Sequence, residues 1–148
     1  MLKKPTDRKF LTQSEKIRIA EATERFSEGF SALDAEKIIA MLAEDIIYEG
    51  QHITHPIEGK PEVSQYIRNR FKILRERKTE PILELAEVTL PLIEDYPCAV
   101  GLDNGSPSMI FSLTLSEEVT RIDLYSILPR PEDARRSGVI ISNGKRRL

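Results

Sequence analysis

The stretch 26-FSEGFSALDAEKIIAMLAEDIIYEG-50 contains the end of a predicted helix, a second short helix and a strand in direct succession. Phe26, Phe30 and Leu33 continue an apolar pattern that starts at Ile19 and recurs at steps of three and four residues. This spacing is typical of a helix with one apolar face. It predicts a helix from about Ser14 to Ser31.

Polar residues mark where the helices begin. Thr12 followed by Glu15 has the spacing of a capping box, in which each side chain accepts a hydrogen bond from the other residue's backbone N–H. Asp34 can cap the second, short helix, whose apolar residues are Ile38, Ile39 and Leu42. The pattern then predicts a strand from Ile46 to Glu49.

The chain from Gly50 to Gly59 is expected to form a loop or to extend that strand. Pro61 suits the first turn of a third helix, because the missing N–H of proline costs nothing there. Apolar residues recur behind it at helical spacing, at Val63, Ile67, Phe71 and Leu74. This third helix is predicted to end near Arg77.

From Pro81 the pattern changes to that of strands. Residues 82–90, 98–102, 109–115 and 119–128 form short segments rich in strand-favouring residues and separated by turn residues. They predict three or four antiparallel strands. Helices collected first and strands last indicate an α+β domain, in which N-terminal helices pack on a strongly curved antiparallel sheet.

Composition excludes several classes of partner. Over 148 residues the net charge is −2, with both signs spread along the chain, so no overall field attracts nucleic acid or an anionic membrane. The lone Cys98 cannot form an internal disulfide, which fits a reducing compartment. The longest apolar run, Ile38 to Ala43, is far shorter than the ~20 residues that span a bilayer. We expect a soluble, cytoplasmic protein without a nucleic-acid or membrane partner.

Both ends of the chain differ from the middle. Residues 1–13 contain basic residues with no apolar run behind them, so they predict a flexible leader rather than a signal peptide or an anchor. Residues 129–148 carry six basic and two acidic side chains. They predict a solvated basic tail, because no aromatic residue lies among these charges to stack on a nucleic-acid base.

The order of elements and residues resembles the nuclear transport factor 2-like superfamily, which includes ketosteroid isomerases, limonene epoxide hydrolases and SnoaL-type polyketide cyclases. The resemblance rests on residues 26–50, on 56-PIEGKPEVSQYI-67 and on 117-EEVTRIDLY-125. It implies a cystatin-like cone over residues 14–128, with an apolar cavity that opens at one end. It also implies a homodimer through the outer face of the sheet, which we expect to expose Phe111, Leu113 and Leu115 or their neighbours.

The resemblance places functional residues on the predicted strand. Tyr48 matches the tyrosine that holds the attacking water in the epoxide hydrolases. Gly50 stands where those enzymes have an asparagine and the isomerases have the aspartate base. The arginine of the hydrolases has no counterpart between Tyr96 and Phe111, and their last-strand aspartate falls on Leu124. The chain therefore matches neither catalytic set in full.

Alternation along the strand decides which of its side chains point inward. If the strand continues, Ile46, Tyr48 and His52 face the cavity, while Ile47 and Glu49 face away. Tyr48 and His52 are therefore the candidate catalytic residues, as a hydrogen-bond donor and an acid or base. The candidate ligand-binding residues are the apolar walls and a histidine near the opening: Phe26, Phe30, Ile67, Phe71 and His55.

Two functions remain open from the sequence. The first is a cofactor-free isomerase, cyclase or dehydratase that acts on a small apolar substrate. The second is a non-catalytic ligand-binding or dimerisation module with the same fold. We expect no metal, because His52 and His55 supply two ligands at most, whereas a catalytic zinc takes three from the protein.

Overall fold

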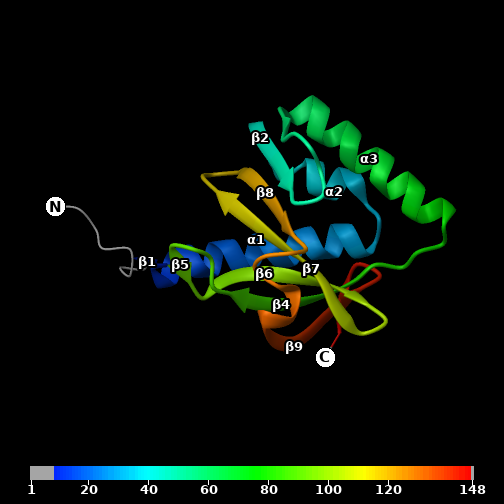
Figure 1. The fold of residues 1–148 in the computed structure, drawn as a ribbon. Helices are drawn as coiled ribbons and strands as arrows, with labels where there is room; N and C mark the ends of the chain where they lie inside the picture. The colour runs from blue at the N-terminus through cyan, green and yellow to red at the C-terminus, as the bar shows by residue number, and fades with distance from the viewer. Residues whose placement is uncertain (1–8, 148) are drawn as a thin grey trace.

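The computed structural model describes residues 9–147, and Figure 1 shows the order of its elements. Three α-helices are present in this part of the chain, α1 (Gln13–Ser31), α2 (Ala35–Ile39) and α3 (Lys60–Glu76), with a short 3-10 helix, η1 (Pro131–Asp133). Most strands form one large sheet. The strands are β1 (Lys9–Phe10), β2 (Leu42–Gly50), β3 (Ile57–Glu58), β4 (Ile82–Val88), β5 (Ile93–Glu94), β6 (Tyr96–Asp103), β7 (Ser106–Leu115), β8 (Val119–Tyr125), β9 (Arg135–Ser142) and β10 (Lys145–Arg147).

The helices begin where their caps predict. Thr12 Oγ1 accepts a hydrogen bond from the Glu15 N–H at 3.1 Å, and the Glu15 carboxylate accepts one from the Thr12 N–H at 2.9 Å. Asp34 accepts a hydrogen bond from the Lys37 N–H at 3.2 Å and caps α2. Pro61 lies in the first turn of α3. Both capping predictions are therefore confirmed.

The large sheet has the strand order β10-β9-β4-β6-β7-β8-β2-β3. The four strands predicted after Pro81 correspond to β4, β6, β7 and β8, and they pair antiparallel as expected. The exception within the sheet is β2, which pairs parallel to β8 with Tyr48 opposite Ile122. The α+β class is confirmed, and the sheet is mixed rather than wholly antiparallel. Strand direction here is set by a pairing between distant segments, which local periodicity does not report.

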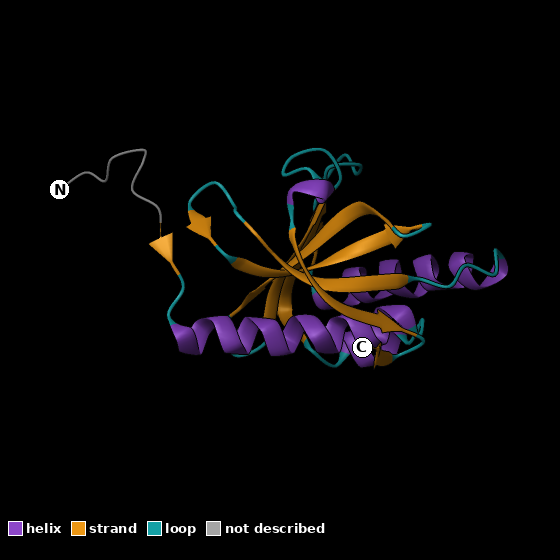
Figure 2. Cartoon of the chain, turned by 90° about the horizontal axis from the view of Figure 1, so that it is seen from below, coloured by secondary structure: helices purple, strands orange, loops and turns teal. Residues whose placement is uncertain are grey.

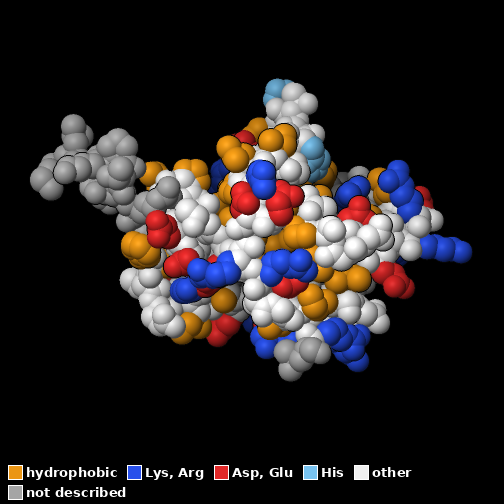
Figure 3. Space-filling view, turned by 60° about the horizontal axis from the view of Figure 1, so that its bottom comes forward, with side chains coloured by type: hydrophobic (Ala, Val, Ile, Leu, Met, Phe, Trp, Pro, Cys, Tyr) orange, Lys and Arg blue, Asp and Glu red, His pale blue; other side chains and the backbone are white. Residues whose placement is uncertain are grey.

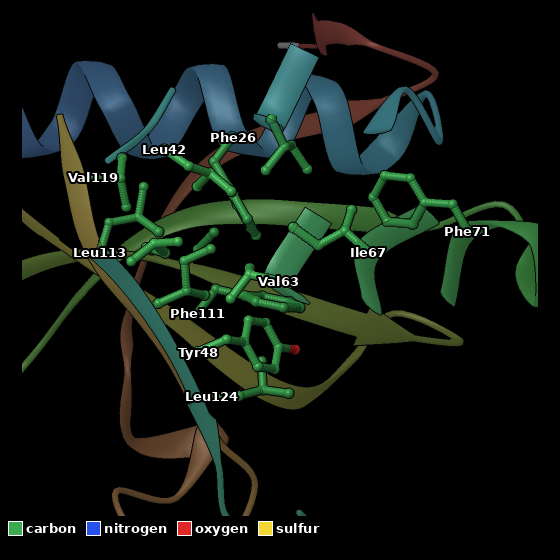
Figure 4. Packing of buried hydrophobic residues seen from close by; sticks show 14 of the residues in the cluster. Phe26, Leu42, Tyr48, Val63, Ile67, Phe71, Phe111, Leu113, Val119 and Leu124 are labelled. Atoms are coloured by element: carbon green, nitrogen blue, oxygen red, sulfur yellow. The ribbon is translucent and has the colours of Figure 1, made fainter. Parts of the chain in front are cut away.

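The main core lies between the helices and one face of the sheet. Phe26 of α1 and Phe71 of α3 pack with Phe111 and Leu113 of β7 in one cluster of buried residues, and Figure 4 shows these side chains converging from both layers. Phe111 and Leu113 are 2% and 1% exposed. The expectation that they lie on an exposed outer face is therefore wrong, because β7 turns these two side chains toward the helices.

The opposite face of the sheet is covered by the chain itself. Residues 126–134 cross this face between β8 and β9, and Figure 2 shows η1 on the side of the sheet away from α1. Ala134 from this crossover packs in a second core cluster with Cys98, Val100 and Ile110. Val100 and Ile110 are 0% exposed. The sheet therefore has a buried layer on both faces.

The segment expected to be a basic tail instead forms part of the sheet. β9 pairs antiparallel with β4, and its Ile141 is 0% exposed. The basic residues find acidic partners elsewhere: Arg136 contacts Glu84 at 2.7 Å and Arg146 contacts Glu24 at 2.8 Å. A local charge count cannot detect such neutralisation by distant residues. The expected boundary at residue 128 therefore lies inside the fold.

The expected flexible leader is also partly structured. Lys9 and Phe10 pair in parallel with Ile93 and Glu94 of β5, and α1 begins at Gln13. Residues 1–8 lie outside the described part of the chain. Within residues 9–147, no helix has the length and apolar character that crossing a membrane requires.

Candidate functional site at the open end of the cone

The strand β2 carries the candidate residues, and its side chains alternate as predicted. Ile46 is 0% exposed and Tyr48 is 7% exposed, whereas Glu49 lies on the surface. Figure 4 shows Tyr48 within the core cluster, with its hydroxyl directed away from β2. Tyr48 therefore faces the interior of the cone.

The histidines do not follow this alternation. The strand ends at Gly50, where the Gly50 carbonyl accepts a hydrogen bond from the Ile53 N–H at 3.1 Å and closes a turn. His52 and His55 are both exposed, and Figure 3 shows both histidines on the molecular surface. The expectation that His52 points into the cavity is wrong, because the turn interrupts the two-residue period. His55 also lies outside the cavity walls.

Gly50 lies on the inner side of β2, opposite Leu124. A Cβ at this position would meet Leu124 Cβ at 3.3 Å and His52 Cε1 at 3.1 Å, which is close for either contact. The packing therefore leaves little room for the carboxylate or amide that the resemblance places here.

Gln51 ties this turn to residues 126–128, a role that no sequence pattern indicates. Its side-chain oxygen accepts hydrogen bonds from the N–H groups of Ser126 at 2.8 Å, Ile127 at 2.7 Å and Leu128 at 3.3 Å. Its side-chain nitrogen donates to the Leu128 carbonyl at 2.6 Å. Gln51 therefore joins the end of β2 to the start of the crossover over the sheet.

The inner cavity of the cone brings together the predicted walls. Phe26, Phe30, Ile67 and Phe71 line it together with Tyr48; three further lining residues, which the sequence analysis missed, are Ile38, Tyr66 and Arg70. The volume is only about 10 Å³, roughly one water molecule. Aromatic packing fills the rest, with the Phe30 ring centroid 5.1 Å from that of Phe71 and 4.9 Å from that of Phe111.

A larger cavity of about 270 Å³ opens next to it. It lies between the C-terminal half of α3 and the ends of β6 and β7 that meet in a hairpin, and it shares Phe30 and Arg70 with the inner cavity. Phe30 therefore stands between the two spaces. The remaining lining residues are mostly apolar: Leu74, Thr79, Pro81, Ile82, Leu83, Gly101, Leu102, Asp103, Ser108, Met109 and Phe111.

The polar residues that line the inner cavity are Tyr48, Tyr66 and Arg70. Burial raises the pKa of the Tyr48 phenol, Tyr66 raises it further, and the Arg70 guanidinium opposes the shift. The rings of Tyr48 and Tyr66 are 4.9 Å apart. Tyr48 is therefore a neutral hydrogen-bond donor at every physiological pH, and it is unsuited to act as a base.

Arg70 is the polar residue that the sequence could have revealed. Ile67, Arg70, Phe71 and Leu74 follow the spacing of one helix face. An arginine within such an apolar stripe must bring its guanidinium to the edge of the core.

The walls offer little for acid–base chemistry. Asp103, which is exposed at the rim, is the one carboxylate among the described residues that line either cavity, and neither cavity is lined by histidine. Within residues 9–147, no three side chains of histidine, cysteine, aspartate or glutamate lie close enough to hold a metal ion. The arrangement can hold a polar group by hydrogen bonds and charge.

Comparison with known proteins identifies the fold through solved structures. No family model and no curated protein matches the chain. A nuclear transport factor 2-like protein of unknown function from Pseudomonas putida KT2440 matches with a TM-score of 0.55 and 18% identity, over 78% of this chain and 88% of the other. A SnoaL-like protein of unknown function from Burkholderia thailandensis E264 matches with a TM-score of 0.54 and 13% identity, over 79% and 98%. A third, a nuclear transport factor 2-like protein of unknown function from Mesorhizobium loti, matches with a TM-score of 0.55 and 12% identity, over 80% of this chain and 98% of the other.

Proposed function

We propose that this chain, which has the nuclear transport factor 2-like fold, binds a small, mainly apolar molecule at the open end of its cone. The observation that carries the proposal is the cavity of about 270 Å³, whose walls are mainly apolar and include a few polar residues, namely Arg70, Thr79, Asp103 and Ser108. Ligand sites in proteins have this build and volumes of roughly 300–1,000 Å³, and this cavity lies just below that range. A compact ligand fits this space.

Phe30 gives the ligand a route to Tyr48. Its ring separates the two cavities and is only partly buried, unlike the fully enclosed Phe71. A change of the Phe30 rotamer would join the spaces and expose the Tyr48 hydroxyl to a ligand carbonyl. Tyr48 would then donate the hydrogen bond that orients the ligand, with Phe26, Ile67 and Phe71 behind it.

Binding without catalysis accounts for the site better than an isomerase or cyclase does. His52 is exposed and lines neither cavity, and Gly50 supplies no carboxylate at the position of the isomerase base. General acid–base catalysis needs a group that titrates within reach of the substrate. Tyr48 alone supplies a hydrogen bond, which is sufficient for recognition.

The test is a fluorescence titration with N-phenyl-1-naphthylamine, a neutral apolar probe that brightens on leaving water. Met109 lines the open cavity, so Met109→Trp should fill it and weaken probe binding by about tenfold or more. Leu92, which is 66% exposed and lines neither cavity, provides the control variant Leu92→Trp. Failure of the wild type to bind the probe, or equal binding by both variants, would refute a ligand site here.

We also propose that the chain forms a homodimer through the side of the sheet that residues 126–134 cross. Ile127 and Leu128 in this crossover are 68% and 70% exposed. Leu128 borders a shallow hollow whose other apolar residues are Val88, Leu90, Pro91 and Pro129. Apolar side chains that stand together on a surface favour burial against a second molecule.

A further inference from the structure

We infer that the ligand carries a single carboxylate and that Arg70 binds it at the junction of the two cavities. This inference rests on the proposed function and names the chemical class of its ligand. It follows from the position of Arg70, from its lack of an internal partner and from the charge of its surroundings.

The position of Arg70 is fixed by its helix. It lies on α3 between Ile67 and Phe71, both of which are buried, and it lines the inner and the open cavity alike. Its positive charge acts on the Tyr48 phenol across the inner cavity. A ligand that enters the open cavity therefore meets one cation and apolar surface together.

Several described arginines, among them Arg18, Arg25, Arg75 and Arg77, have no carboxylate partner, and Arg70 is the one of these that lines the two cavities. Among residues 9–147, it makes no ion pair, and Asp103 of the same cavity lies beyond ion-pair distance. Arginines elsewhere contact carboxylates at 2.8, 2.6 and 2.7 Å, in the pairs Arg68–Glu36, Arg121–Glu49 and Arg136–Glu84. The guanidinium of Arg70 is thus available to a ligand.

The surroundings favour a monoanion. A guanidinium presents two parallel N–H groups that match the two oxygens of a carboxylate, and such charge-assisted pairs are stronger than neutral hydrogen bonds. A phosphate dianion would leave its second charge without a partner, and Asp103 at the rim would repel it more strongly than it repels a monoanion. One cation, one rim carboxylate and apolar walls therefore suit an apolar monocarboxylate.

Two ligands of nearly equal shape test this inference. We would measure how 2-naphthoate and its neutral analogue 2-naphthamide displace N-phenyl-1-naphthylamine from the full chain. The wild type should bind 2-naphthoate more tightly than 2-naphthamide. Arg70→Gln should weaken 2-naphthoate by about tenfold, which corresponds to about 1.4 kcal/mol, and should leave 2-naphthamide and the probe within about twofold. Arg70→Lys should recover part of the loss, because lysine keeps the charge but not the paired N–H geometry.

Arg68→Gln is the matched control, since it removes the same charge from the same helix at a residue that lines neither cavity. It should leave the 2-naphthoate affinity unchanged. If the probe binds the wild type but 2-naphthoate binds no better than 2-naphthamide, the carboxylate inference is overturned and the proposed apolar site stands. Equal weakening by Arg70→Gln and Arg68→Gln would also overturn it. Absence of probe binding would instead refute the site itself.

Discussion

Individual side chains in the stretch 44–60 have roles that their chemistry alone does not predict. Histidine is the residue type that most often acts as an acid or base in enzymes, yet His52 lies exposed beyond the end of β2. Tyr48 faces the cone, and Gln51, which carries no charge and cannot titrate, joins β2 to residues 126–128. Position within the fold therefore outweighs residue type in assigning function here.

Removing the Gln51 side chain should destabilise the crossover. Gln51→Ala leaves three backbone N–H groups and one carbonyl to water, so we expect a loss of about 1–2 kcal/mol in the free energy of unfolding. Urea denaturation followed by circular dichroism measures it. Gln65→Ala is the control, because Gln65 makes one side-chain hydrogen bond, to Asn69 at 3.0 Å on the surface of α3. Equal effects of the two changes would contradict the role given to Gln51.

Cys98 should be unreactive in the folded protein. Its side chain is 1% exposed, and burial, with a smaller effect of Glu87, raises the pKa of the thiol to about 12. Because the thiolate is the reactive form, a thiol reagent at pH 8 should label the chain only after denaturation. Because the thiol ionises at a higher pH in the folded protein than in the unfolded chain, Cys98 stabilises the fold at pH values below about 8.5, the pKa of the unfolded thiol. This stabilisation is lost as the pH rises from there toward 12. Rapid labelling of the native protein would show that this side of the sheet opens.

At the scale of elements, β9 changes the expected layout most. Its partner β4 supplies Glu84, which is 3% exposed and accepts hydrogen bonds from Arg136 at 2.7 Å and from the Gly138 N–H at 2.9 Å. Burial raises the pKa of the Glu84 carboxyl, but these hydrogen bonds outweigh it and leave the pKa below its usual 4.5. The ionised contact therefore stabilises the pairing of β4 with β9 above about pH 4.5, and its contribution is lost as the pH falls further.

Truncating the side chain of Ile141 tests whether β9 is part of the core. Ile141 is 0% exposed, so Ile141→Ala should cost about 2–5 kcal/mol in the free energy of unfolding. Ile140→Ala removes the same atoms from a neighbouring, half-buried position and should cost clearly less. Deleting residues 134–148 should abolish cooperative unfolding in a thermal melt. An unchanged melting temperature after that deletion would restore the original interpretation of this segment as a solvated tail.

On the scale of the whole molecule, the sheet is buried on both faces by the chain itself. Helices cover one face, and residues 126–134 cross the other, where Ala134 packs against β-strand residues. A homodimer through this second side would therefore meet the crossover rather than bare strands. Its contact would centre on Ile127 and Leu128, the large apolar side chains that the crossover leaves exposed.

The homodimer can be tested by light scattering at micromolar concentration. The wild type should show twice the mass of one chain, and Ile127→Glu should show the mass of one chain, because it places a charge in the proposed contact. Ile73, which is 39% exposed on α3, provides the control Ile73→Glu, which should remain dimeric. A wild-type mass of one chain would exclude dimerisation through the crossover under these conditions.

The sequence by itself determined the features that depend on near neighbours. The capping box at Thr12, the cap at Asp34 and the helical spacing of Val63, Ile67, Phe71 and Leu74 located the helices, because these interactions span three or four residues. Alternation on β2 also placed Ile46 and Tyr48 inside. The same local patterns identified four of the side chains that line the inner cavity, namely Phe26, Phe30, Ile67 and Phe71.

Only the tertiary structure decided what depends on residues far apart in the chain. Three features arise from strands that meet across the sheet. They are the parallel pairing of β2 with β8, the pairing of β9 with β4 that adds β9 to the sheet, and the burial of Phe111 toward the helices. The turn that exposes His52 ends the alternation on which its prediction relied, and the cavity next to Arg70 is formed by α3, β6 and β7 together. Local periodicity carries no information about such contacts, because their free energy comes from surfaces that are brought together only when the whole chain folds.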